Sequence, residues 1–255
     1  MAALLGVYQP RRINGPARVE AGEQPNVFLT IGGVGLICWG GARLLAASLF
    51  SQGAPAAQMS NGQLVLANGL IDVTSLAAML AATFRLRPMG LQRTGVGFNQ
   101  LPAGLMGGFV SIVVVLPLIF WVETGSEYLW TLLGQSHPQA HPLLLILSDA
   151  HSIWLRAVIV VTAVVLAPLA EEMFFRGQIQ TFLRYTLQNP WLAVLITAAC
   201  FALVHEWWTW PSIFFLGLCL GYAYERTGNL WTCVVLHALF NLASIVLFVH
   251  ETAPK

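Results

Sequence analysis

The chain has 255 residues, of which 57% are hydrophobic and only 9% are charged. Because soluble domains carry about 25% charged residues, this composition excludes an ordinary soluble domain and indicates a membrane protein with several spanning helices. The net charge of +1 gives no basis for binding nucleic acid or another polyanion. The cysteines lie inside apolar runs without CxxC spacing, which argues against a zinc ribbon or a disulfide framework: Cys38, Cys200, Cys219 and Cys233.

A polar tail of 26 residues with three arginines opens the chain. The apolar run that follows, residues 27–50, is longer than the 7–15 apolar residues that a secretory signal peptide has. We therefore expect an uncleaved first spanning helix, with cleavage near residues 54–57 as the alternative. No composition shift divides the rest, so we expect residues 27–255 to form a single transmembrane domain.

Seven apolar segments predict an all-α fold, a polytopic helical bundle of about seven transmembrane helices, within a range of six to eight. The fifth and sixth segments are short, so we expect them to be tilted or shielded inside the bundle. Pro117 predicts a kink in the third segment. The seven segments are residues 27–50, 64–84, 103–122, 152–170, 191–205, 211–224 and 230–249.

We expect helical structure in two of the connections between the apolar segments. Residues 123–150 read as a long connection without lysine or arginine, in which residues 141–147 are predicted to form an interfacial helix. Residues 177–188 read as an amphipathic continuation of the fourth span, with Arg184 on its polar side.

Loop arginines predict the orientation, because basic loops face the cytoplasm. The N-terminal tail and residues 85–100 are basic, so we expect both on the cytoplasmic side and the candidate site to open toward it. The expected location is a multi-pass protein of the plasma or inner membrane in a bacterium, or of the endoplasmic reticulum in a eukaryote.

Polar residues in the last four spans are the candidates for chemistry, because ionisable groups at membrane depth are costly. Glu172 and Arg176 share a helix face, whereas Glu171 is turned about 100° away and stays free. His205 ends the fifth span, and the last span carries a histidine and an asparagine four residues apart, His237 and Asn241. A carboxylate and imidazoles can take a proton from water, and imidazole and carboxamide groups can stabilise an oxyanion.

A structural interpretation stands beside this one. Alone, each imidazole or carboxamide can serve as a hydrogen bond between helices, and Glu172 with Arg176 can serve as a neutralised structural pair. Asp72, inside the second span, is assigned a structural or interfacial role, and Glu206 at most a supporting one.

Three motifs resemble those of the CPBP family, the CAAX protease and bacteriocin-processing (Abi) family of intramembrane glutamic endopeptidases. Residues 171–177, Glu-Glu-Met-Phe-Phe-Arg-Gly, resemble its EExxxRG motif. Residues 201–205 resemble its FxxxH motif, and residues 237–241 its HxxxN motif. The segment between the last two motifs also matches, and the resemblance covers roughly residues 167–241 within a catalytic core of about 152–249.

The resemblance implies an endopeptidase that cleaves a membrane-associated protein or peptide in the lipid bilayer without a metal or other cofactor. By motif position, Glu171 and His205 activate the attacking water, and His237 and Asn241 stabilise the oxyanion. Glu172 and Arg176 support this set. In eukaryotic members the substrate is a prenylated CAAX C-terminus, whereas bacterial members have varied substrates, including those of bacteriocin immunity.

Two alternatives use the same residues differently. Glu171, His205 and His237 could bind a divalent metal as two histidines and one carboxylate, which would make the protein a metal-dependent membrane protease. Alternatively, the polar cluster only holds helices together, and the protein is a non-catalytic immunity factor or scaffold.

Overall fold

The computed structural model describes residues 24–50, 60–87, 90–136 and 142–252, and within these ranges the fold is all-α, as the sequence predicts. Among the described residues, five helical stretches are long and apolar enough to cross a membrane: Asn26–Leu45, Asn61–Leu86, Gly90–Leu132, Ile153–Leu187 and Leu230–Thr252. The segments expected to be short form α10 (Pro190–Leu203) and α11 (Trp210–Thr227), which pack against each other. The four cysteines form no disulfide within the described residues.

The N-terminal part of the bundle consists of α2 (Asn26–Phe50) and α3 (Asn61–Leu86), which lie side by side. Ser60 caps α3 through a capping box with Gln63, because each side chain bonds the other residue's backbone N–H. The basic connection after α3 contains a short helix, α4 (Gly90–Thr94), and a 3₁₀ turn, η2 (Phe98–Gln100).

The third span is much longer than the apolar segment predicts. Helix α5 (Leu101–Leu132) continues for ten residues beyond position 122, with Pro117 inside it, and the chain turns at Gly134 with a φ of 64°. The expected connection 123–150 is therefore wrong in its first part, because Glu123 and Glu127 end the apolar run without ending the helix. Helix α6 (Pro142–Asp149) confirms that a helix forms where residues 141–147 predict one, although His141 lies outside the described residues.

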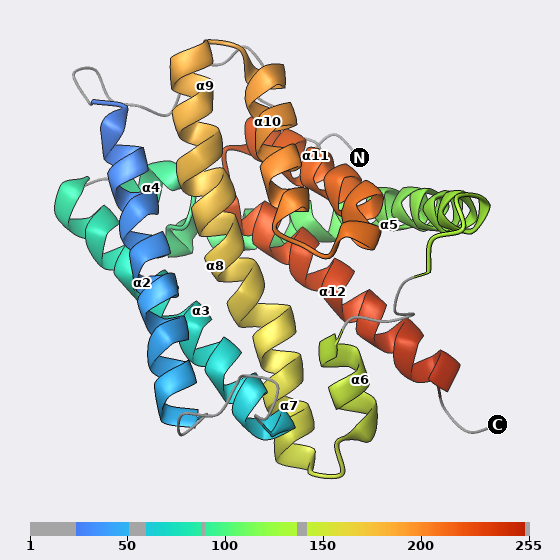
Figure 1. The fold of residues 1–255 in the computed structure, drawn as a ribbon. Coiled ribbons are helices and arrows are strands. Elements are labelled where there is room, and N and C mark those ends of the chain that lie inside the picture. Colours follow the sequence, from blue (N-terminus) through green and yellow to red (C-terminus); the bar gives the residue numbers. More distant parts are fainter. Residues whose placement is uncertain (1–23, 51–59, 88–89, 137–141, 253–255) are drawn as a thin grey trace.

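The fourth span is one continuous helix of five sections (Figure 1). It begins with α7 (Ile153–Val161), and two π-helical turns, η3 (Thr162–Leu166) and η4 (Phe175–Gln180), enclose α8 (Ala167–Phe174). The final section, α9 (Thr181–Leu187), is the predicted continuation. The polar side of this continuation is the buried one, since Gln178, Gln180 and Arg184 are all buried.

The last helix, α12 (Leu230–Thr252), crosses α5 at a close contact (Figure 1). A Cβ atom at Gly104 would lie 2.3 Å from the Cβ atom of Trp231, and one at Gly108 would lie 2.5 Å from Val235. These glycines let the two backbones approach, as small residues do between membrane helices.

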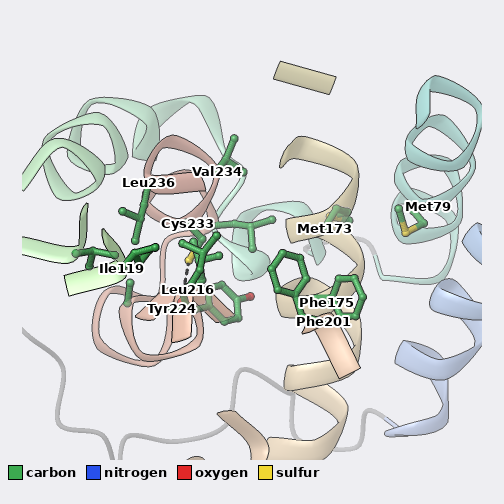
Figure 2. Close-up of a cluster of buried hydrophobic side chains, with 14 of the residues drawn as sticks. Met79, Ile119, Met173, Phe175, Phe201, Leu216, Tyr224, Cys233, Val234 and Leu236 are labelled. Carbon is green, nitrogen blue, oxygen red and sulfur yellow. Dashed lines mark hydrogen bonds between the residues drawn. The ribbon is translucent and has the colours of Figure 1, made fainter. Parts of the chain in front are cut away.

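The main core lies where α8, α10, α11 and α12 meet (Figure 2). Phe175 and Phe201 pack edge to face with ring centroids 5.1 Å apart, which joins the helix of the glutamates to α10. Other core side chains shown there include Met173, Leu216, Tyr224, Cys233 and Leu236.

Candidate active site

The two neighbouring glutamates of α8 have different environments. Consecutive helical residues are turned about 100° apart, so their side chains leave the helix in different directions. The side chain of Glu172 is fully buried, whereas that of Glu171 is 32% exposed. This difference agrees with the expectation that one glutamate is paired and the other is free.

Arg176 is the partner of Glu172. Its Nη1 atom lies 2.7 Å from Oε1 of Glu172, and its Nη2 donates to the carbonyl of Gly217 on α11 at 3.3 Å. The guanidinium also lies over the ring of Phe201, 4.5 Å from its centroid. Because both charges are buried, each needs the other, and the pair ties α8 to α10 and α11.

His237 on α12 links this ion pair to Glu171. Its Nδ1 atom lies 3.0 Å from Oε1 of Glu172, and its Nε2 atom lies 3.9 Å from Oε2 of Glu171. A carboxylate paired with arginine accepts hydrogen bonds, so we assign the proton of the neutral imidazole to Nδ1. The Nε2 atom then presents its lone pair to Glu171.

His205 approaches Glu171 from the turn that follows α10. Its Nδ1 atom lies 2.7 Å from the carbonyl oxygen of Phe201, which can only accept, so this nitrogen carries the proton. Its Nε2 atom lies 4.0 Å from Oε2 of Glu171. Trp210 holds the turn in place, since its indole N–H donates to the carbonyl of His205 at 3.0 Å.

Three acceptor atoms therefore converge in one place, on side chains from three helical segments. They are Oε2 of Glu171 and the Nε2 atoms of His205 and His237. Within the described part of the chain, Oε2 of Glu171 has no hydrogen-bond partner. Separations of 3.9 and 4.0 Å are too long for direct hydrogen bonds. Within the described residues, these three acceptors therefore do not satisfy one another.

Asn241 is placed differently from the other candidates. It lies one turn after His237, and its Nδ2 atom donates to the carbonyl of Ala163 in η3 at 2.8 Å. One of its two amide hydrogens is therefore used by the helix that carries the glutamates.

The same three acceptors are those of the metal alternative. Among the residues that the structure describes, no group of three His, Cys, Asp or Glu side chains is arranged to hold a metal ion. The described residues thus give that alternative no formed binding site.

Comparison with known families identifies the segment that contains this site. Residues 152–243 match the family model described as Type II CAAX prenyl endopeptidase Rce1-like. This segment belongs to the CAAX protease family. Neither the curated proteins nor the solved structures gave a match.

The matched Rce1-like segment runs from the N-cap of α7 to just beyond Asn241 and includes all six candidate residues. The family resemblance predicted from the motifs is confirmed. With its long apolar helices, the chain is an integral membrane protein, and its residues 152–243 match a family of CAAX protease-type enzymes.

The structure shows a row of polar contacts between two helices of the Rce1-like segment. The sequence analysis did not predict these contacts. Beyond the contact of Arg176, Gln180 Nε2 donates to the carbonyl of Gly221 and to Oε1 of Glu225, each at 3.0 Å. Arg184 Nε lies 3.5 Å from Oε2 of Glu225. The signal was present as polar or glycine residues repeating every fourth position: 176, 180 and 184 on one helix, and 217, 221 and 225 on the other.

A further acidic residue, Asp72, lies outside the Rce1-like segment. Asp72 on α3 interacts electrostatically with Glu171. Helix α3 packs against α8 and η3, and a Cβ atom at Gly69, one turn before Asp72, would lie 3.4 Å from Oγ1 of Thr162. No motif marks Asp72, so only the packing of the helices relates it to the site.

Proposed function

We propose that the protein is a glutamic intramembrane endopeptidase, in which Glu171 with His205 activates water for attack on a peptide bond. The observation that supports this most directly is the convergence of both Nε2 atoms on Oε2 of Glu171, at 4.0 and 3.9 Å. Two acceptors at such a separation can each receive one hydrogen bond from a single bridging water molecule. The water oxygen then keeps both lone pairs, and one of them can attack the carbonyl carbon.

The first step transfers one proton and forms one bond. Glu171, assisted by His205, accepts a proton from water while the water oxygen bonds to the carbonyl carbon of the substrate. The electron pair of the carbonyl moves onto its oxygen and gives a tetrahedral oxyanion. In the second step the C–N bond breaks, and the leaving nitrogen takes the proton from the same acid to give an amine and a carboxylic acid.

His237 and Asn241 are proposed to stabilise the oxyanion. Because Nδ1 of His237 bonds Glu172, this residue can donate to the oxyanion only through Nε2, once that nitrogen has also taken a proton. Asn241 can contribute its second amide hydrogen, since the first is held by Ala163. Glu172 and Arg176 support this arrangement by fixing the ring of His237.

The proposed substrate is a membrane-associated protein or peptide, and a prenylated CAAX-like C-terminus is the first candidate because the matched family is described by that activity. We propose a site that opens toward the cytoplasm, in the plasma or inner membrane or in the endoplasmic reticulum, and a catalytic core of about residues 152–249. The basic N-terminal tail and the basic loop at residues 85–100 support this orientation.

The decisive experiment compares wild type with Glu171→Gln and Glu206→Gln in liposomes. The substrates are a farnesylated CAAX peptide and a set of unmodified membrane peptides, and the products are read by mass spectrometry. Glu206 is the matched control, because it is exposed and lies beside His205 in sequence. We expect wild type and Glu206→Gln to cleave and a folded Glu171→Gln not to cleave. Equal cleavage by Glu171→Gln, or none by wild type, would support the scaffold alternative.

The metal alternative is separated by chelation. Wild type is assayed in metal-free buffer with a strong chelator such as phenanthroline. The glutamic mechanism predicts unchanged turnover, whereas a loss of activity that a divalent cation restores would assign Glu171, His205 and His237 to a metal.

A further inference from the structure

The helix that carries Glu171 contains a π turn just before it, and this turn changes which backbone groups are paired. At the end of η3, the N–H of Ala167 donates to the carbonyl of Thr162, five residues earlier. In an α-helix the same N–H would donate to Ala163. The next N–H that a π turn could offer to Ala163 belongs to position 168, and Pro168 has none.

Asn241 supplies the donor that the helix does not offer. Its Nδ2 atom lies 2.8 Å from the carbonyl oxygen of Ala163, and this contact joins α12 to η3. A carbonyl without a donor is costly inside a membrane, where water does not replace the missing bond, so this hydrogen bond stabilises the π turn in particular. Pro168 is itself buried, at the beginning of α8 and three residues before Glu171.

The π turn determines the direction in which Glu171 points. A π turn holds one residue more than an α turn, and each α-helical residue advances about 100° around the axis. Converting η3 into α-helix would therefore rotate α8 by about that angle relative to α7. Such a rotation would turn Oε2 of Glu171 away from the Nε2 atoms of His205 and His237, which lie 4.0 and 3.9 Å from it.

We propose that Pro168 and Asn241 are positioning residues: the proline favours the π turn, Asn241 bonds the carbonyl that the turn leaves, and together they keep Glu171 facing the two imidazoles. The inference rests on the proposed function only where activity is concerned. The hydrogen bond and its dependence on Pro168 are properties of the fold.

The test is a double-mutant cycle of Pro168→Ala and Asn241→Ala, with thermal unfolding measured in detergent. In the wild-type background, Asn241→Ala should lower the midpoint by roughly 2–4 °C or more. In the Pro168→Ala background the new N–H gives Ala163 an intrahelical donor, so the same substitution should cost less than half as much. Equal costs in both backgrounds would overturn the proposal.

Pro117→Ala is the matched control, because it also removes a proline from inside a membrane helix, on α5. Its effect should be additive with that of Asn241→Ala, and coupling as strong as that of Pro168 would also refute the specific pairing. In activity, Pro168→Ala should lower kcat roughly 10- to 100-fold with little change in KM, because a misplaced catalytic group costs turnover more than binding. Pro117→Ala should leave kcat unchanged.

A direct measurement keeps the proposal testable if a variant does not fold. The carbonyl ¹³C chemical shift of Ala163 in wild type should show a hydrogen-bonded carbonyl, and it should move upfield in Asn241→Ala. An unchanged shift would overturn the inference. If wild type cleaves no substrate, the proposed function fails, whereas the cycle and the carbonyl shift still decide this inference.

Discussion

Oε1 of Glu172 accepts from two residues at once: Nη1 of Arg176 at 2.7 Å and Nδ1 of His237 at 3.0 Å. One carboxylate oxygen therefore connects the ion pair within α8–η4 to an imidazole of α12. The arginine and this oxygen form a buried ion pair, and the hydrogen bond from Nδ1 fixes the ring of His237 so that Nε2 faces Glu171. Glu172 thus has a role in the geometry of the site although the free carboxylate is Glu171.

Breaking this ion pair on one side should destabilise the fold strongly. Arg176→Met leaves Glu172 charged and fully buried without its main partner, which costs about 3–5 kcal/mol. The double variant Glu172→Gln with Arg176→Met should recover part of that loss, because no charge stays unpaired. Free energies of unfolding in detergent check this, and additive losses would show that the two side chains do not depend on each other.

The two histidines should affect turnover alike and stability differently. Replacing either with asparagine should lower kcat by about 10²-fold or more, because in the proposed mechanism His205 helps to activate the water and His237 stabilises the oxyanion. His237 is buried and bonded to Glu172, so its substitution should also lower the melting temperature, whereas the side chain of His205 is 27% exposed and bonds the carbonyl of Phe201 one turn earlier. Parallel kinetics and thermal unfolding separate the two cases. An equal loss of stability in the two variants would contradict the difference in burial and hydrogen bonding between His205 and His237.

Gly104→Ala should disturb the contact between α5 and α12, because its Cβ atom would lie 2.3 Å from that of Trp231. We expect a loss of about 1–3 kcal/mol from overpacking. Gly125→Ala on the same helix has open space around it and should be neutral or stabilise by up to about 1 kcal/mol. The difference between the two unfolding midpoints is the measurement, and similar midpoints would mean that the helices adjust freely.

Trp210→Phe should slow cleavage by roughly tenfold through the position of His205, because it removes the N–H that donates to the His205 carbonyl. Trp191→Phe is the control, since Trp191 is exposed and stacks on Tyr222 away from the site. Single-turnover rates for both variants decide the matter. A loss of the same size in Trp191→Phe would point to a general effect of tryptophan removal.

The elements of the fold were predictable from the sequence because long apolar runs can only be helices in lipid. The error at α5 shows the limit of this argument. Glu123 and Glu127 end the apolar run, but glutamate is a good helix former, so the helix continues to Leu132. Hydropathy marks where a segment stops being apolar, and that position differs from the end of the helix.

The candidate residues were predictable as a set, because carboxylates, histidines and an asparagine are conspicuous in apolar helices. The contacts between these residues were not predictable from the sequence. Spacing of four residues pairs Glu172 with Arg176, but it cannot show that His237 bonds Glu172 or that Asn241 bonds Ala163. Asp72 was assigned a structural role because its relation to Glu171 depends on how α3 packs on α8.

The position of Arg176 four residues after Glu172 has a consequence for biosynthesis. Their pair can form as soon as this helix is made, before α12 has left the ribosome, since its partners are neighbours on one helix face. A nearly neutral helix enters the bilayer at lower cost than one with separate charges. The contact with His237 forms only when α12 arrives, so the site is completed after the helix with the glutamates has been made.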